Sequence, residues 1–194
     1  MCEYSRRRVR PTDWRRQLLA MPPGARDAWV DAQLGLGTLP DDGPDLPRDG
    51  VAYLPAPVDA LLTFVELADL GPTDVIIDVG AGLGRSTWAL HRLTGARVIG
   101  VEVQAALFQQ ARRAPGGPTF VHGDAADLRH PEATAYFLYC PFGGATLDRW
   151  LDGLPRQREA RLGCVDLPLP PRPGLTLHTE RLALRLYRLA PLNP

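Results

Sequence analysis

Several features are scarce or missing in this 194-residue chain, and each absence excludes a class of protein. No apolar run approaches the roughly 18 residues that a membrane-spanning helix needs. The arginine-rich start is not followed by the apolar stretch of a secretion signal. The cysteines, Cys2, Cys140 and Cys164, form no CxxC motif, so neither a disulfide framework nor a zinc site is indicated. We therefore expect a soluble, cytoplasmic protein that holds no metal and contacts no membrane.

Lysine is absent altogether, and the 22 basic residues, all arginine, balance 22 acidic residues. Zero net charge gives no general attraction to nucleic acid, so we do not expect a nucleic-acid partner. The abundance of Ala, Gly, Pro and Arg is typical of a GC-rich bacterial genome, which accounts for the missing lysine through codon usage. Selection against a reactive amine is the alternative explanation.

The first 50 residues differ from the rest in composition and in the spacing of their apolar residues. Helical spacing predicts one short helix ending at Ala20 and another over 25–36, and a stretch rich in Pro, Asp and Gly follows over 37–50. We interpret 1–50 as an accessory segment, either a lid or a substrate clamp, and 51–194 as the main domain. The arginines at 6, 7, 8, 10, 15 and 16 form either a small phosphate-binding arm or a solvated terminus.

Beyond residue 51, short apolar strands alternate with amphipathic helices. Strands are predicted at 75–79, 97–101, 119–121, 135–140 and 161–166, and helices at 58–70, 85–93, 104–113 and 146–151. Imperfect alternation over 175–178 and 181–189 predicts two antiparallel strands. The pattern predicts an α/β three-layer sandwich, in which helices cover both faces of a mostly parallel sheet of about seven strands, with an antiparallel C-terminal strand.

A glycine-rich loop follows the first of these strands. Asp78 precedes Gly80-Ala81-Gly82-Leu83-Gly84, and the next helix begins at Arg85 or Ser86. A dinucleotide-binding fingerprint, G-x-G-x-x-G, would require glycine at position 85. Arg85 therefore argues against a nicotinamide-dependent oxidoreductase. The alternative to a ligand-binding loop is a tight turn that binds nothing.

This G-x-G-x-G spacing resembles motif I of the Rossmann-like methyltransferases that use S-adenosyl-L-methionine. Tyr53-Leu54-Pro55-Ala56-Pro57 resembles the Tyr-x-Pro-x-Pro segment of small bacterial members, and the likeness extends over about 51–150. The resemblance implies a Rossmann-like fold and S-adenosyl-L-methionine as cofactor. It further implies that the loop residues contact the cofactor, namely Gly80, Ala81, Gly82 and Gly84, and that Asp78 either organises the loop or meets the methionine amine through water.

Two further acidic residues follow predicted strands at the spacing of this family. Glu102 ends the second strand, and the resemblance implies that its carboxylate accepts hydrogen bonds from the ribose hydroxyls, with Val103 beside it. Asp124 follows the third strand. There the resemblance implies contact with the adenine amino group, while the backbone of Ala125 meets a ring nitrogen. Asp127 is a competitor for that role, and ordinary surface acids are the alternative reading of all three.

The segment Tyr139-Cys140-Pro141-Phe142 resembles a variant of the acceptor motif at the end of the fourth strand, with Cys140 where an amide or carboxylate is usual. We expect Tyr53, Tyr139, Cys140 and Phe142 to line the acceptor site; a covalent role for Cys140 is the alternative to simple lining. The implied activity is in-line methyl transfer to a small-molecule or protein (peptide) amino or hydroxyl acceptor. A non-catalytic module that binds S-adenosyl-L-methionine and serves as a partner or scaffold is the alternative, and a homodimer is left open.

Overall fold

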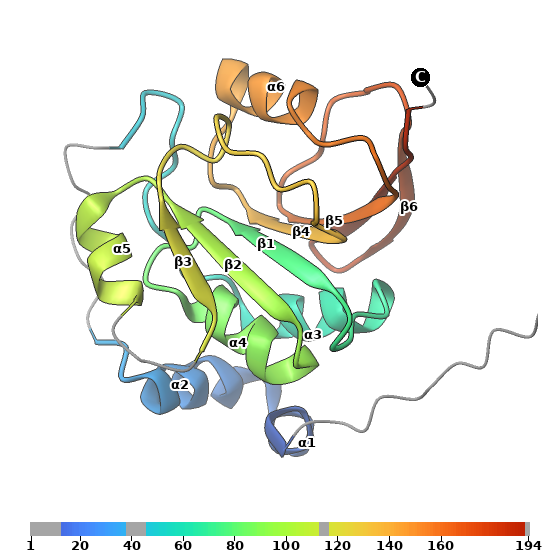
Figure 1. The fold of residues 1–194 in the computed structure, drawn as a ribbon. Helices are drawn as coiled ribbons and strands as arrows, with labels where there is room; N and C mark the ends of the chain where they lie inside the picture. The colour runs from blue at the N-terminus through green and yellow to red at the C-terminus, as the bar shows by residue number, and fades with distance from the viewer. Residues whose placement is uncertain (1–12, 38–45, 113–116, 193–194) are drawn as a thin grey trace, which may run out of the picture.

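A seven-stranded sheet forms the centre of the computed structural model, which describes residues 13–37, 46–112 and 117–192 (Figure 1). The strand order is β3-β2-β1-β4-β5-β7-β6. The strands are β1 (Val75–Val79), β2 (Arg97–Glu102), β3 (Thr119–His122), β4 (Ala135–Tyr139), β5 (Ala160–Val165), β6 (Leu175–Arg181) and β7 (Leu184–Leu189). Strands β1 to β5 pair in parallel, and β7 runs antiparallel to both β5 and β6. The predicted mostly parallel sheet with an antiparallel C-terminal strand is confirmed.

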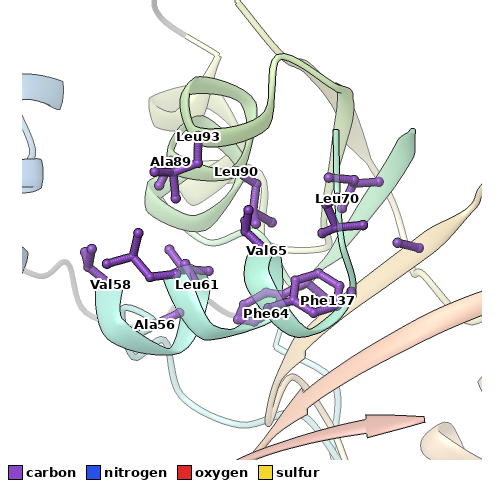
Figure 2. Packing of buried hydrophobic residues seen from close by; sticks show 14 of the residues in the cluster. Ala56, Val58, Leu61, Phe64, Val65, Leu70, Ala89, Leu90, Leu93 and Phe137 are labelled. Atoms are coloured by element: carbon purple, nitrogen blue, oxygen red, sulfur yellow. The ribbon is translucent and has the colours of Figure 1, made fainter. Parts of the chain in front are cut away.

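One face of the sheet is covered by α3 (Val58–Leu67) and α4 (Arg85–Thr94). Figure 2 shows this apolar layer, in which Phe64 of α3 lies against Phe137 of β4 with ring centroids 5.5 Å apart. Outside it lie α1 (Asp13–Ala20) and α2 (Pro23–Leu34). Leu18 and Val30 are fully buried in the same apolar cluster, so the two N-terminal helices share the core of the main domain.

The opposite face is covered by α6 (Gly144–Asp152), whose buried residues include Leu147 and Trp150. Trp150 meets Tyr136 of β4 edge to face at 5.8 Å. Buried side chains from the irregular segments before β4 and after β5, among them Ala126 and Leu169, complete this second layer. The remaining helix, α5 (Ala105–Ala111), packs beside β2 and β3. Helices therefore lie on both faces, as the three-layer prediction required.

Several helix boundaries differ by a few residues from those expected, and two of the differences have a local cause. Helix α2 begins at Pro23, two residues before the predicted start at 25, because the first helical turn needs no N–H donor from proline. Helix α3 ends at Leu67, three residues early, and Asp69 there takes a left-handed φ of 50°. The arginines at 6, 7, 8 and 10, the acidic residues at 41, 42 and 45, and Cys2 lie outside the described residues.

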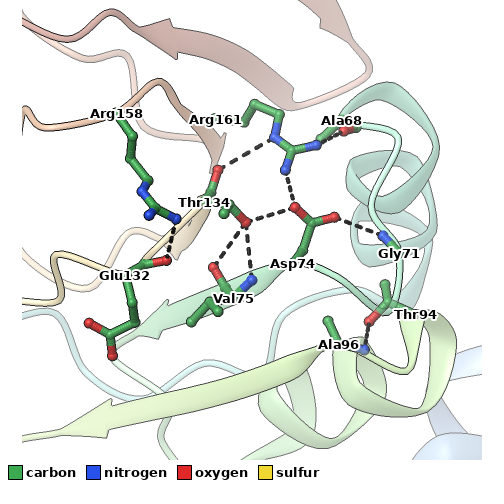
Figure 3. Close-up of polar contacts among 10 residues, drawn as sticks. All are labelled: Ala68, Gly71, Asp74, Val75, Thr94, Ala96, Glu132, Thr134, Arg158 and Arg161. Carbon is green, nitrogen blue, oxygen red and sulfur yellow. Dashed lines mark hydrogen bonds and ion pairs between the residues drawn. The ribbon is translucent and has the colours of Figure 1, made fainter. Parts of the chain in front are cut away.

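A cluster of polar side chains joins the strands at the end of the sheet opposite to the glycine loop (Figure 3). Asp74, just before β1, accepts hydrogen bonds from the Thr134 hydroxyl at 2.7 Å and the Gly71 amide at 2.9 Å. Arg161 of β5 also pairs with Asp74 and donates to the Ala68 carbonyl at 2.5 Å. The cluster joins the end of α3 to three neighbouring strands and so fixes their register.

Candidate functional site

The glycine loop joins β1 to α4 at the carboxyl end of the parallel strands. The amides of Gly80 and Ala81 both donate to the Val101 carbonyl of β2, at 3.0 and 2.9 Å. Gly80 has a φ of 77°, and a Cβ at this position would lie 2.6 Å from Cβ of Pro141. Glycine is needed here because the turn is left-handed and its backbone touches the loop that follows β4.

Asp78 lies beneath this loop with only 1% of its surface exposed. One carboxylate oxygen accepts hydrogen bonds from the hydroxyls of Ser86, at 2.6 Å, and Thr87, at 2.5 Å. Burial raises the pKa of Asp78 to about 6, although both hydroxyl hydrogen bonds act in the opposite direction. These contacts tie the start of α4 to β1.

Glu102 ends β2 and faces the same loop. Its Oε2 accepts from the Gly82 amide at 2.7 Å, and its Oε1 accepts from the Gln104 amide at 2.8 Å. Burial raises the pKa of Glu102, and the backbone hydrogen bonds lower it. A carboxylate oxygen can accept more than one hydrogen bond. The amides therefore fix the carboxylate while leaving each oxygen able to accept a ligand hydroxyl.

Asp124 follows β3 and is held from two sides. Its Oδ1 accepts from the Ala126 amide at 2.9 Å, and its Oδ2 is 2.5 Å from a guanidinium nitrogen of Arg149 on α6. The same arginine lies 3.3 Å from the Asp127 carboxylate. Sequence reasoning missed Arg149, and nothing in its local pattern distinguishes it from the other surface arginines.

Tyr53 lies across the glycine loop. A Cβ built on Gly82 would lie 1.9 Å from Cε2 of the Tyr53 ring, so the ring occupies the space that a side chain would need. Burial raises the pKa of Tyr53 to about 12, partly offset by the Arg85 guanidinium and by a hydrogen bond from the Leu83 backbone. The structure thus brings the Tyr-x-Pro-x-Pro segment onto the glycine loop, and the phenol hydroxyl remains protonated at neutral pH.

The acceptor motif follows β4. Cys140 has a left-handed φ of 42°, and its Sγ lies 3.3 Å from the carbonyl oxygens of both Val165 and Asp166, which it contacts as a donor. Burial and the Asp166 carboxylate raise the pKa of the Cys140 thiol, which disfavours the nucleophilic thiolate. Burial likewise raises the pKa of Tyr139. Phe142 is buried against Trp150, with ring centroids 6.2 Å apart.

Residues 49–51, here called the strap, cross this motif. The Val51 amide donates to the Pro141 carbonyl at 3.1 Å, and the Gly143 amide donates to the Asp49 carbonyl at 3.0 Å. Gly50 and Phe142 form an isolated antiparallel bridge. The sequence pattern, interpreted as an accessory segment over 1–50, did not predict this pairing, because the strap lacks the alternation of a strand.

One cavity unites most of these residues. The predicted cofactor residues that line it are Gly80, Glu102, Val103, Asp124 and Ala125, and the predicted acceptor residues that line it are Tyr53, Tyr139, Cys140 and Phe142. The predicted cofactor residues that do not line it are Asp78, Ala81, Gly82 and Gly84. Lining residues that sequence reasoning missed include Gln104, Leu107 and Thr146. The cavity therefore joins the two sets of residues that the sequence assigned to cofactor and acceptor.

Among the described residues, no group of three or more His, Cys, Asp or Glu side chains is placed to hold a metal ion. No helix in the same residues is long and apolar enough to cross a membrane.

Comparison with known families identifies the region around the cavity. Residues 76–153, from β1 through α6, match the sequence model of a family described as a methyltransferase domain. This stretch is therefore similar to a methyltransferase domain. S-adenosyl-L-methionine is the cofactor that such a domain implies, in agreement with the sequence prediction. No curated protein matches the chain.

Solved structures share the fold of the methyltransferase domain. An RNA methyltransferase from Salinibacter ruber in complex with S-adenosyl-L-homocysteine is 24% identical, with a TM-score of 0.58 over 73% of this chain and 97% of that one. The protein yhhF from Escherichia coli, a proposed methyltransferase, is 25% identical, with a TM-score of 0.54 over 76% and 92%. A proposed RNA methyltransferase from Pyrococcus horikoshii is 16% identical, with a TM-score of 0.56 over 87% and 100%. The Rossmann-like fold is thereby confirmed.

Proposed function

We propose that the protein transfers a methyl group, in line, from S-adenosyl-L-methionine to an amino or hydroxyl group of a small molecule or protein. The observation that carries this proposal is the single cavity in which Glu102 and Asp124 face the acceptor motif at the end of β4. A methyl donor and its acceptor must lie within van der Waals contact for such a displacement. A cavity that joins both sets of residues provides that arrangement.

The residues present fit the cofactor. Glu102 is fixed by two amides and retains acceptor capacity for ribose hydroxyls. Asp124 can accept from an adenine amino group, with the Ala125 backbone beside it. Gly80 lines the cavity without a side chain, which suits close approach of its backbone to the methionine part. We assign these residues, together with Asp78, Ala81, Gly84 and Val103, to the cofactor site.

The bound cofactor would supply an electrophilic methyl group on a positively charged sulfur. Positive charge is lost as the methyl group leaves, so the protein contributes chiefly positioning and a site shielded from water. Tyr139 and Cys140 both have raised pKa values, so each stays protonated at neutral pH and is better suited to lining the acceptor site than to acting as a base. We assign Tyr53, Tyr139, Cys140 and Phe142 to that lining.

The strap favours a small or slender acceptor. Residues 49–51 are hydrogen-bonded across the acceptor motif, and Leu46, Pro47 and Leu54 line the same side of the cavity. A free metabolite or a protruding protein side chain fits such a covered site better than a flat surface does. Because two of the similar structures are of an RNA methyltransferase and a proposed one, RNA is included among the acceptors to be tested.

A second candidate is a module that binds S-adenosyl-L-methionine without transferring its methyl group. The orientation of Cys140 favours it, since the thiol points to the carbonyls of Val165 and Asp166. The cysteine side chain carries neither an amide nor a carboxylate, and its thiol is engaged with these carbonyls, so position 140 offers no polar side chain to hold an acceptor.

Isothermal titration calorimetry with S-adenosyl-L-methionine and S-adenosyl-L-homocysteine tests the cofactor assignment. We expect micromolar binding by the wild type and a loss of about 1–3 kcal/mol in Glu102→Ala. Glu66→Ala, which removes an exposed carboxylate paired with Arg181 on the surface, serves as the control and should bind normally. Absence of binding by the wild type would refute the proposal.

Methyl-labelled cofactor then tests transfer. Label should appear in one fraction of a panel of small amines, alcohols, peptides and RNA. Tight cofactor binding without transfer to any fraction would favour the non-catalytic module.

A further inference from the structure

Arg85 is a buried cation directly after the glycine loop. It is the first residue of α4, and only 6% of its surface is exposed. Its Nε donates to Oδ1 of Asp31 on α2 at 2.7 Å, and its Nη2 pairs with the other oxygen of the same carboxylate. This two-pronged pairing fixes the guanidinium in both position and orientation.

The same guanidinium reaches the segment that carries Tyr53. Its Nη1 donates to the Ala56 carbonyl at 3.3 Å and lies 3.6 Å from the Asp27 carboxylate. Asp27, one helical turn before Asp31, also accepts from the Val58 amide at 2.9 Å. Helix α2, the Tyr53–Pro57 segment and the start of α4 therefore meet at Arg85.

Three consecutive side chains anchor the end of the glycine loop in two directions. Ser86 and Thr87 bond to Asp78 on the sheet side, whereas Arg85 bonds to Asp31 on the helix side. Between these anchors, the Gly82 amide meets Glu102 and the Gly82 backbone touches the Tyr53 ring. A shift of Arg85 would therefore reach Gly82 by two routes, through the loop itself and through the segment that carries Tyr53.

We infer that Arg85 and Asp31 are positioning residues for the cofactor, holding the glycine loop and Tyr53 in the arrangement that binds it. The inference rests on the proposed function. Helix α2 precedes the matched methyltransferase region, and under this inference it supports the cofactor site through Asp31. Neither residue needs to touch the cofactor, because each acts through the backbone of the loop.

Attachment of α2 to the domain does not depend on this pair. Arg26 of α2 lies 2.5 Å from Asp59 of α3 and also donates to the Leu18 carbonyl at 2.9 Å. Val30 is fully buried, and Trp14 and Trp29 meet edge to face at 5.1 Å. Buried ion pairs generally add little net stability over apolar packing, so a pair retained beside the loop is better explained by its effect on the loop.

The experiment compares Asp31→Asn and Arg85→Lys with the control Arg26→Met, which breaks an ion pair of α2 that does not reach the loop. The first readout is the rate of amide hydrogen exchange at Gly82 and Gly84 in the ligand-free protein. Each variant is measured at a temperature the same number of degrees below its own thermal unfolding midpoint. The second is the Kd for S-adenosyl-L-homocysteine. We expect Asp31→Asn to speed exchange and to raise the Kd by about tenfold each, a change typical of a lost charge-assisted contact.

Arg85→Lys keeps the charge but loses the two-pronged geometry, so its exchange rates and its Kd should be close to those of Asp31→Asn. Asp31→Glu, which keeps a carboxylate, should recover part of the affinity. Arg26→Met should stay within about twofold of the wild type in both readouts.

Three outcomes would overturn the inference. If Asp31→Asn and Arg26→Met behave alike while the wild type binds, the pair is structural and the proposed function stands. The same holds if exchange at the loop rises but the Kd does not change. If the wild type binds neither S-adenosyl-L-methionine nor its demethylated product, the proposed function falls and the inference falls with it.

Discussion

Replacement of Gly82 by alanine tests the contact between the glycine loop and Tyr53. The new Cβ would lie 1.9 Å from Cε2 of the tyrosine ring, much closer than two carbon atoms can approach. The ring packs on the loop, so either the ring must be displaced or the loop must move. The substitution therefore disturbs the loop and the Tyr53 segment together.

Two separate penalties determine the size of the effect. Gly82 has a φ of 54°, and a left-handed conformation costs a residue with a Cβ about 1–2 kcal/mol. Overpacking a well-filled site adds about 1–3 kcal/mol. We expect Gly82→Ala to lower the free energy of unfolding by about 2–5 kcal/mol. In a Tyr53→Ala background only the backbone penalty of about 1–2 kcal/mol should remain.

Urea unfolding of the four proteins in this double-mutant cycle measures both penalties. Two glycines supply matched controls, Gly24 within α2 and Gly35 directly after it. Gly35 has a φ of 62° but no atom within 4 Å of a built Cβ, so Gly35→Ala reports the backbone penalty alone. Gly24 has neither constraint and should tolerate alanine. If Gly82→Ala costs no more than Gly35→Ala, the Tyr53 ring does not lie on the loop and the reasoning is wrong.

Three further predictions concern stability, pH and thiol chemistry. Arg161→Met should lower the unfolding free energy by about 2–4 kcal/mol, because it leaves the partly buried Asp74 without its cation, while calorimetry should show unchanged cofactor affinity. Burial raises the pKa of Asp78 from 3.8 to about 6, so the contribution of Asp78 to the free energy of unfolding falls as pH rises through this window. The stability of Asp78→Asn relative to the wild type, measured by urea unfolding, should therefore increase from pH 4 to pH 7, and a constant difference would contradict this. Cys140 should be alkylated more slowly than a free thiol at pH 7.5, as followed by mass spectrometry, since its pKa is raised; rapid labelling would instead support a nucleophilic role.

The fold could be predicted from sequence because its signals are local. Each parallel strand is a short apolar run followed by a polar loop and an amphipathic helix, and this alternation predicts the layer order. The boundaries at Pro23 and Leu67 were misjudged for local reasons as well. A proline favours the first helical turn, and the left-handed conformation of Asp69 could not be predicted from the apolar spacing of α3.

The candidate site was only partly predictable. Glycine spacing and strand-end acids predicted Gly80, Glu102 and Asp124, and the structure places all three on one cavity. Arg149, which holds Asp124, and Asp31, which holds Arg85, lie 25 and 54 residues from their partners. One sequence cannot pair such residues, because a surface arginine and a helical aspartate have the same local pattern wherever they occur.

The burial of α1 and α2 limits where this chain could be shortened. Truncation at residue 51, the start of the main domain expected from sequence, would uncover the surface that Leu18 and Val30 now cover. Newly exposed apolar patches of this kind promote aggregation. It would also leave the guanidinium of Arg85 without either carboxylate of α2. The smallest stretch that we expect to remain soluble therefore begins no later than α1, well ahead of the matched methyltransferase region.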